Sequence, residues 1–439
     1  MNICHVNAQY ILGGSETVMR QLHEGLIRHG HRSNLQVAWG KSFPPEVFPL
    51  YPRLLSWLHH SRMNGLVEAV FPRDSWTDRA FRRLASSDYD LIHVHSFLSY
   101  SRLESLFEVA MRKPVVWTLH SFWGPGPGES SSHGHAQEAY GMAPQVLKFP
   151  LPEQGGVVEK LQQELIQLGT APLHIISPSL MLANELHRCP AFSHWSTCCI
   201  PNGVNPSLFG FERKSDPGFR QSLQLTPGTT VILVVNRNYR VADKGFSMIR
   251  EALAGLRSFD AIEVVLVGEG AGWAADQLPE KLRVLPLEFV SDRTRMAGLY
   301  EAADLFLFAS RYENFPCVTL EAMSAGCCVV ATPTPGVVEQ IVEGVSGCLA
   351  EAVSGQALGA TLQNALDQPR EFRRNLGLRA RKEVERGFTE DKMVERHLQF
   401  YADTIAGYPD KIARHAAIRS GAVPLKDDET LEKTSQRRT

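Results

Sequence analysis

Residues 304–331 hold two glutamates on either side of a proline, a pattern that suits the binding of a phosphorylated ligand. The segment reads DLFLFASRYENFPCVTLEAMSAGCCVVA, which predicts a strand, a loop, a helix and a second strand. Pro316 falls at the expected first helical position, where a missing N–H is tolerated. The N–H groups of Asn314, Phe315 and Cys317 would then be open at a helix N-terminus, a site suited to a diphosphate.

Glu313 and Glu321 flank this helix end and could bind the neutral, hydroxyl-rich parts of such a ligand. Glu313 would lie beside the phosphates, whereas Glu321, about a turn and a half into the helix, could accept hydrogen bonds from both hydroxyls of a ribose. In the alternative interpretation, Glu313 is an ordinary charged loop residue and Glu321 lies on a solvated helix face. The neighbours of Glu321 are apolar instead: Val318, Leu320, Ala322 and Ala325. We therefore interpret the segment as a binding site for a nucleotide-diphosphate sugar.

Short apolar runs that alternate with amphipathic stretches must position this segment. The predicted strands of the first half are 2–7, 34–38, 90–95, 114–119, 173–177 and 197–200. Those of the second half are 230–235, 262–267, 282–286, 304–308, 327–331 and 347–349. Uninterrupted runs such as VILVV are typical of parallel strands buried on both faces. The helical patterns between them indicate right-handed crossovers, so we expect an α/β protein with two doubly wound parallel sheets.

A polar, turn-rich segment at 200–210 marks the expected boundary between two domains. We predict an N-terminal domain over 1–204 and a C-terminal domain over 205–388. A helix at about 389–408 would pack back on the first domain. Residues 410–439 lose apolar content and gain charge, which predicts a loose tail.

Three further motifs follow predicted strands, where α/β proteins bind ligands. Gly13 and Gly14 would let the backbone approach a phosphate closely, with a simple tight turn as the alternative. Lys244 follows the strand 230–235, a position that favours a role in the binding site; the alternative is that it is an ordinary surface lysine. His120 ends the strand 114–119, a position that favours a role in the binding site. The alternative is a histidine whose hydrogen bonds are made within the core.

Composition excludes several classes of protein. The 439 residues carry a net charge of -2, which gives no sign of a nucleic-acid binder. The eight cysteines include no CxxC pair, so we expect reduced, core-filling thiols in a cytosolic protein. No run of about eighteen apolar residues occurs. We therefore expect a cytoplasmic protein whose membrane contact, at the inner face, is at most peripheral.

Segment 51–83 is the candidate for such peripheral contact. It contains six arginines and three acidic residues. Its large apolar side chains are interleaved with these charges: Leu54, Leu55, Trp57, Leu58, Phe71, Trp76 and Phe81. Arginine and tryptophan interleaved in this way can dock a helix on anionic lipid. An ordinary amphipathic crossover is the alternative.

Two other functions have some support in the sequence. His93 with His95, and His133 with His135, form HxH pairs that suit a metal-dependent hydrolase, although strand alternation alone also places such residues together. A nucleotide-sugar-binding module without catalysis is the second alternative. The glycines of VGEGAG at 267–272 follow a GxGxG spacing, which argues against a dinucleotide-dependent oxidoreductase.

These motifs resemble, in order and over roughly residues 1–405, those of the GT-B glycosyltransferases of family 4. ENFPCVTLE with AMSAGCCVVAT resembles the family's E-x7-E motif, and GGSE at 13–16 resembles its glycine-rich loop. YDLIHVHS at 89–96 and VVWTLHSFW at 115–123 are similar to two of its strands. IPNGVNPSLF at 200–209 is similar to its linker.

The resemblance implies a GT-B fold, in which two Rossmann-like domains face each other across a cleft. It also implies retention of anomeric configuration and no required metal or other cofactor. It makes Lys244 the residue that neutralises the donor phosphates, Glu313 a ligand of the sugar hydroxyls, and His120 a contact of the donor sugar. These three are the expected catalytic residues. Ser121 stands where the family usually has aspartate.

The resemblance leaves parts of the donor site open. The family's phosphate-binding arginine precedes the lysine by five positions, where this chain has Tyr239, so Arg237 and Arg240 both remain candidates. Leu287 and the residues up to Val290 are expected to hold the base. A UDP-sugar is the expected donor, with GDP- and ADP-sugars as alternatives. The expected acceptor is a sugar, polysaccharide, small-molecule or lipid-linked hydroxyl, in polysaccharide or glycoconjugate biosynthesis.

Overall fold

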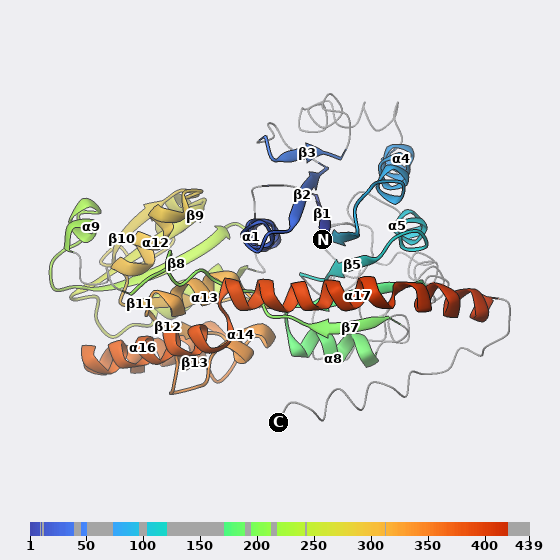
Figure 1. Cartoon of the computed structure of the whole chain (residues 1–439). Helices are drawn as coiled ribbons and strands as arrows, with labels where there is room; N and C mark the ends of the chain where they lie inside the picture. The colour runs from blue at the N-terminus through green and yellow to red at the C-terminus, as the bar shows by residue number, and fades with distance from the viewer. Residues whose placement is uncertain are drawn as a thin grey trace, which may run out of the picture. The chain divides into compact units, whose positions relative to one another are not determined.

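The chain forms two compact units in the computed structural model, each built on a parallel sheet (Figure 1). Unit 1 comprises Met1–Ile200 and Val394–Thr439, and unit 2 comprises Pro201–Met393. The structure describes the following residues: 1–8, 10, 13–38, 45–50, 73–95, 103–120, 171–188, 195–211, 217–241, 244–311 and 313–419. The predicted α/β class with two parallel sheets is confirmed.

Unit 1 is built on a parallel sheet in the order β3-β2-β1-β4-β5-β6-β7. The strands are β1 (Asn2–Asn7), β2 (Arg32–Val37), β3 (Val47–Pro49), β4 (Leu91–Val94), β5 (Val115–Thr118), β6 (Leu173–Ser177) and β7 (Ser196–Cys199). The helices are α1 (Gly14–Arg28), α4 (Arg73–Ala85), α5 (Leu103–Ala110), α8 (Leu180–Arg188) and, from Val394 onward, α17 (Glu390–Arg419). All residues of β1, β4, β5 and β6 are buried. The strand order reverses between β1 and β4, and such a switch point is where open α/β sheets bind ligands.

The described part of unit 1 has one strand more than the sequence predicts. β3 pairs with β2 in parallel, with Val47 opposite Leu35, and forms the edge of the sheet. The surrounding sequence FPPEVFPL contains three prolines, which argue against a central strand. An edge strand tolerates Pro49 because one of its sides needs no N–H donor.

Unit 2 is built on a parallel sheet in the order β10-β9-β8-β11-β12-β13. The strands are β8 (Thr230–Asn238), β9 (Ile262–Glu269), β10 (Arg283–Leu287), β11 (Leu305–Phe308), β12 (Cys328–Ala331) and β13 (Cys348–Leu349). The helices are α9 (Pro217–Ser222), α10 (Phe246–Ala254), α11 (Ala271–Ala275), α12 (Arg293–Ala302), α13 (Cys317–Ser324), α14 (Pro335–Gln340), α15 (Gly355–Asp367) and α16 (Arg370–Gly387). Successive strand residues enter two separate apolar clusters, as Leu305 and Phe306 do, so both faces of the sheet are covered.

The prediction of a loose tail over 410–439 is wrong for residues 410–419, because α17 continues to Arg419. The hydroxyl of Tyr408 donates to the carbonyl of Ala110 over 2.9 Å, and the ring of His415 packs edge-on against Phe107. The charge that suggested a tail lies on the exposed face of a helix whose other face is buried. Residues 420–439 lie outside the described part of the chain.

The segment expected to contact a membrane is described only from residue 73 onward, in α4. Phe81, which the sequence placed among the apolar side chains of a lipid-docking face, is 2% exposed and belongs to the core of unit 1. Its neighbours Ala80 and Leu84 are buried as well. Within the described residues, no helix has the length and hydropathy to cross a bilayer.

Two glycines of α16 give a test of how closely this helix packs. A Cβ on Gly377 would lie 2.0 Å from the carbonyl oxygen of Gly326, whereas a Cβ on Gly387 would have no atom within 4 Å. Gly377→Ala should therefore lower the free energy of unfolding by about 2 kcal/mol, through a clash that backbone must relieve. Gly387→Ala should leave it unchanged or slightly higher, because alanine favours helix. Urea unfolding of both variants checks this; equal midpoints would contradict the close approach.

Candidate functional site

The helix that follows β11 begins one residue later than the sequence predicts. Pro316 is the N-cap of α13, with φ -67° and ψ 131°, and Cys317 is the first helical residue. Proline fits both positions, since neither needs a helical N–H donor. The first N–H groups without an intrahelical acceptor are therefore those of Cys317 and the residues after it. The predicted helix start at Pro316 is therefore wrong by one residue, and the contact of the N–H groups of Asn314, Phe315 and Cys317 with a ligand stays a prediction.

The loop before α13 is held by its carbonyl oxygens. The side-chain amide of Asn202 donates to the carbonyl of Phe315 over 2.8 Å, and that of Gln340 donates to the carbonyl of Pro316 over 3.0 Å. The N–H of Gly336 donates to the carbonyl of Glu313 over 3.2 Å. Neither Asn202 nor Gln340 is among the site residues predicted from the sequence. The signal for Asn202 is its place in IPNG; Gln340 has no comparable signal.

Asn314 and Phe315 form part of the scaffold of this loop rather than an exposed surface. Asn314 is 3% exposed and Phe315 is 4% exposed. A Cβ on Gly336 would lie 1.6 Å from the carbonyl oxygen of Asn314, so the backbone of α14 passes directly against the loop. Any contact of Asn314 or Phe315 with a ligand therefore falls to the backbone, as predicted for their N–H groups; that contact stays a prediction.

Lys244 and Glu313, two of the predicted catalytic residues, form an ion pair. The Nζ atom of Lys244 lies 2.9 Å from Oε1 of Glu313, and the side chains are 41% and 19% exposed. They follow β8 and β11, which are neighbours in the sheet. The amide of Asn236 donates to the carbonyl of Lys244 over 2.9 Å and so fixes the lysine backbone. A partly exposed pair of this kind contributes at most about 1 kcal/mol, so a ligand could separate the two charges at small cost.

The two candidate arginines lie in different settings near the end of β8. The pairing of β8 with β9 shifts register between Val235 and Asn238, so Arg237 lies within this irregularity. Such irregularities commonly re-aim a side chain beside a site. The guanidinium of Arg240 lies over the ring of Trp273, 5.5 Å from its centroid, in a cation–π contact. Both arginines are exposed, and the choice between them stays open.

Tyr239 does not replace the family's arginine. Its side chain is buried, and its hydroxyl donates to the carbonyls of Val234 and Val267, over 3.1 Å and 3.3 Å. Burial raises the pKa of this phenol far above its usual value. Tyr239 therefore stays neutral and closes the end of the β8–β9 pair.

Glu321 lies on α13 with its carboxylate against the hydroxyl of Tyr300. That hydroxyl donates to Oε2 of Glu321 over 2.9 Å. Burial raises the pKa of Glu321 to about 7, against the opposing effects of the Tyr300 hydrogen bond and the positive charge of Arg293. Near neutral pH the carboxyl is therefore divided between its protonated and ionised forms. Glu321 is half-buried, and three of its four predicted apolar neighbours are fully buried: Leu320, Ala322 and Ala325.

The remaining predicted donor-binding residues lie at strand or helix ends. Leu287 is the last residue of β10, and Phe289, two residues on, is 49% exposed. Gly13 is the N-cap of α1 with an extended φ of -166°, and a Cβ on Gly14 would meet no atom within 4 Å. Neither backbone conformation requires glycine, and at position 14 the described residues leave room for a Cβ, so a requirement for glycine there would come from a ligand.

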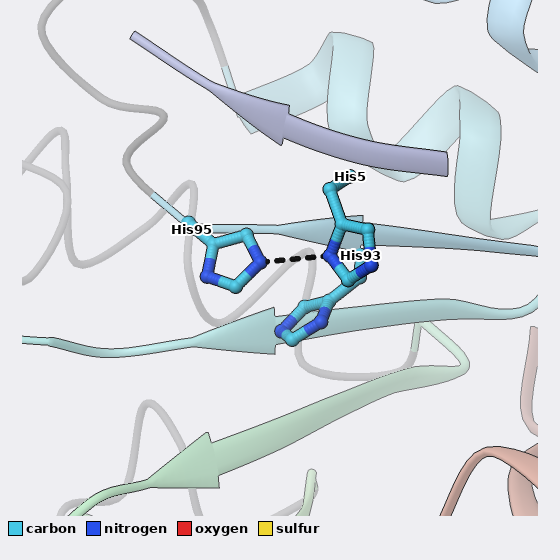
Figure 2. Close-up of side chains that lie close together, drawn as sticks. All are labelled: His5, His93 and His95. Atoms are coloured by element: carbon cyan, nitrogen blue, oxygen red, sulfur yellow. Dashed lines mark hydrogen bonds between the residues drawn. The ribbon is translucent and has the colours of Figure 1, made fainter. Parts of the chain in front are cut away.

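A cluster of buried histidines lies in unit 1 (Figure 2). His5 on β1 is opposite His93 on β4, and His95 follows β4. One ring nitrogen of each lies within 4.8 Å of the others, and all three are at most 2% exposed. Nδ1 of His5 is 3.0 Å from Nε2 of His95, and Nδ1 of His95 is 2.9 Å from Nε2 of His120. The sequence grouped only His93 with His95; the sheet adds His5.

The hydrogen bonds of this cluster bear on the metal-binding alternative. Burial keeps the pKa of His5, His93 and His95 well below the usual value, so the rings are neutral, as metal ligands must be. Yet both nitrogens of His93 are bound, to Tyr401 over 2.6 Å and Thr118 over 2.7 Å. Both nitrogens of His95 are bound to other histidines. A divalent ion would have to break these hydrogen bonds to take these nitrogens as ligands.

His120, the third predicted catalytic residue, lies just after β5 and is half-buried. Burial lowers the pKa of its imidazole to about 3, with a smaller effect from His397. The ring is therefore neutral at physiological pH. Ser121, His133 and His135 lie outside the described residues.

Comparison with known proteins places these features in a family. The sequence model for Glycosyltransferase Family 4 matches residues 12–208, and that for Glycosyl transferases group 1 matches residues 216–383. N-acetyl-alpha-D-glucosaminyl L-malate synthase of Bacillus anthracis is 30% identical over 408 residues, which are 90% of this chain and 95% of that protein.

Solved structures share the fold. A sucrose-phosphate synthase from Thermosynechococcus elongatus superimposes with a TM-score of 0.68 at 18% identity, covering 93% of this chain and 100% of the other. HepE of Anabaena, in complex with UDP and glucose, gives a TM-score of 0.64 at 18% identity, covering 92% and 100%. Together with the two parallel-sheet units, these matches show that the chain is a GT-B glycosyltransferase and belongs to family 4.

Proposed function

We propose that this glycosyltransferase transfers a sugar from a nucleotide-diphosphate donor to an acceptor hydroxyl, with retention of configuration at the anomeric carbon. The observation that carries the proposal is the Lys244–Glu313 ion pair beside the anchored loop and N-terminus of α13. A cation, a carboxylate and a helix N-terminus in one place match a phosphorylated sugar. The Anabaena neighbour, in complex with UDP and glucose, supports a nucleotide-sugar donor.

Donor binding would redistribute the partners of these side chains. The diphosphate lies at the N-terminus of α13, and Lys244 leaves Glu313 to pair with it. Glu313 then accepts hydrogen bonds from sugar hydroxyls, because its former partner is bound to phosphate. Arg237 or Arg240 adds positive charge, and Glu321 in its ionised form accepts from the ribose hydroxyls. Gly13 and Gly14 lie along the donor, and the residues from Leu287 to Val290 hold the base, with UDP favoured over GDP and ADP.

The transfer step we favour is front-face attack. The bond between the anomeric carbon and the diphosphate oxygen breaks, the acceptor oxygen bonds to the same face of that carbon, and the acceptor proton passes to the departing diphosphate. Lys244 and the helix N-terminus stabilise the negative charge that develops on the leaving group. Glu313, bound to Lys244 in the free protein, acts as a hydroxyl ligand rather than a nucleophile. His120 contacts the donor sugar. None of these steps requires a metal ion or other cofactor.

For the acceptor, the proposal names a class of hydroxyl-bearing compounds rather than one compound. A hydroxyl on a sugar, polysaccharide, small molecule or lipid-linked glycan would complete the reaction, in polysaccharide or glycoconjugate biosynthesis. The Bacillus anthracis relative, named for a malate product, favours a small-molecule hydroxyl among these. Reaction in the cytoplasm, with peripheral contact of segment 51–83 at the membrane, remains part of the proposal for a lipid-linked acceptor.

The identity of the donor is testable by thermal stability. A ligand at about 100 times its Kd stabilises a folded protein by about 2.7 kcal/mol. We expect UDP and a UDP-sugar to raise the Tm by several degrees, and GDP- and ADP-sugars to raise it less. Differential scanning fluorimetry with matched concentrations of the three donor classes measures this. A Tm that none of them moves would refute the proposed donor site.

The roles of Lys244 and Glu313 are separable by substitution. Lys244→Ala should weaken UDP binding about 10- to 100-fold, because a charge-assisted contact to phosphate is lost. Glu313→Gln should leave UDP binding within a few-fold and lower kcat for transfer strongly, because its partners are sugar hydroxyls. Calorimetric titration and a product assay distinguish the two effects. Lys281→Ala, at an exposed position before β10, is the matched control. Equal loss of UDP affinity in both site variants would contradict the division of roles.

The raised pKa of Glu321 predicts a pH-dependent stability. The folded protein holds this proton more tightly than an unfolded chain, whose glutamate pKa is about 4.3. The stabilisation is therefore fully present below that value and is lost as the pH rises through about 7. The stability of the wild type relative to Glu321→Gln should fall by on the order of 2 kcal/mol between about pH 4.5 and 8. Urea unfolding across this range tests it, with exposed Glu280→Gln as the control; a flat difference would contradict a raised pKa.

A further inference from the structure

Three histidines of unit 1 form a continuous chain of hydrogen bonds across neighbouring strands. His5 lies on β1, His95 follows β4 and His120 follows β5, in a sheet where these strands are adjacent. The two bonds, from His5 to His95 and from His95 to His120, measure 3.0 Å and 2.9 Å. Figure 2 shows the first of them, with the rings of His5 and His95 turned toward each other. We call these three residues the histidine chain.

Each ring in the histidine chain carries a single proton on its nitrogens. Burial keeps the pKa of His5 and His95 well below the usual value and lowers that of His120 to about 3. A neutral imidazole has one N–H donor and one acceptor nitrogen. His95 uses both nitrogens within the chain, so it must donate to one neighbour and accept from the other. The tautomers of the three rings are therefore coupled, and both hydrogen bonds of the histidine chain donate in the same direction along it.

The inner end of the histidine chain favours one of the two directions. Nε2 of His5 is buried and has no hydrogen-bond partner among the residues that the structure describes. If the bonds ran from His120 toward His5, this atom would carry an N–H buried without an acceptor. Buried N–H groups without an acceptor are rare in proteins, rarer than acceptors that lack a donor. The opposite direction leaves only a lone pair there. It has His5 donate to His95 and His95 donate to Nε2 of His120, which leaves the proton of His120 on Nδ1.

We infer that His95, supported by His5, is a positioning residue that fixes the orientation and tautomer of His120, so that His120 offers Nδ1–H as a donor. The inference rests on the proposed function in one respect, the contact of His120 with the donor sugar. An N–H directed at an oxygen of an anionic nucleotide sugar is favourable, whereas a lone pair in its place would repel that oxygen. The same logic governs other functional histidines, whose second nitrogen is bound by a group that sets the tautomer.

His93 provides an internal comparison. It is as buried as His95, lies two residues away on β4, and its ring centroid is 4.0 Å from that of His95. Its nitrogens bind Tyr401 and Thr118 and take no part in the histidine chain. Substitution of His93 therefore perturbs the same part of the core without removing a donor to His120.

The tautomers can be observed directly by nitrogen-15 NMR of the full chain labelled at histidine. The shifts of Nδ1 and Nε2 show which nitrogen carries the proton, and the signals of His120 are assigned by their loss in His120→Asn. We expect the proton of His120 on Nδ1 in the wild type. His95→Asn keeps an amide N–H near the place of Nδ1 and should preserve this tautomer. His95→Leu, of similar size, removes the donor and should release it, whereas His93→Asn should leave it unchanged.

Activity then tests the role of the tautomer. We expect His95→Leu to lower kcat by about tenfold or more, the effect of about 1.4 kcal/mol in the barrier, with little change in the KM for the donor. His95→Asn should restore most of that loss. A structural role alone would make the two variants equally poor, so rescue by asparagine is the decisive result.

Several results would overturn the inference. One is a wild-type His120 protonated on Nε2, which would show the opposite direction; beyond the wild type, this measurement needs only the assignment variant His120→Asn to fold. Others are equal kcat in His95→Asn and His95→Leu, or a stoichiometric metal in the purified protein that His5→Leu removes. The proposed function fails separately, if no nucleotide sugar binds or reacts, and the NMR result stands in that case.

Discussion

The backbone N–H groups around the start of α13 can face a ligand because the carbonyl oxygens of the same loop are bound inside unit 2. In a trans peptide the N–H and C=O point in opposite directions, so a fixed carbonyl also fixes the next N–H. Gly336 and Gln340 bind the carbonyls of Glu313 and Pro316 and so fix the N–H groups of Asn314 and Cys317. Asn202 binds the carbonyl of Phe315 and fixes the peptide before Pro316, which carries no N–H. Segments some 140 positions apart in sequence therefore hold one short loop, and the geometry of the proposed phosphate site depends on all of them.

Two pairs of charged or polar side chains near this loop are formed before any ligand arrives. Lys244 binds Glu313, and Tyr300 donates to Glu321. Each bond offers a partner that a nucleotide sugar would replace: phosphate for the carboxylate beside Lys244, and sugar or ribose hydroxyls for the donors beside the two glutamates. An ion pair with a side chain 41% exposed is weak enough to exchange in this way. Stability of the free protein is therefore compatible with exchange of these partners for the proposed donor.

Local patterns in the sequence predicted what depends on local structure. The strands before and after α13, the helix between them and the apolar setting of Glu321 all follow from periodicity within a few residues. Where a local signal was ambiguous, tertiary packing decided. The strand β3 was not predicted because its segment contains prolines, which a strand accepts only at the edge of a sheet. The end of α17 was predicted too early because the charged residues beyond 410 suggested a tail. Tyr408 and His415 instead pack one face of that helix against α5.

The histidines show why spacing alone could not settle the chemistry of unit 1. Alternation along β4 places His93 and His95 together, which fits a metal site and an ordinary strand equally well. The parallel register of β1 adds His5, β5 adds His120, and α17 adds Tyr401 from 308 positions away. These contacts depend on the strand order, which no short motif encodes. Once they are known, the partners of each ring nitrogen distinguish the possibilities. His93 is bound at both nitrogens by hydroxyls, and His95 is committed at both of its nitrogens to the rings on either side, so shared protons account for the cluster better than a metal ion does.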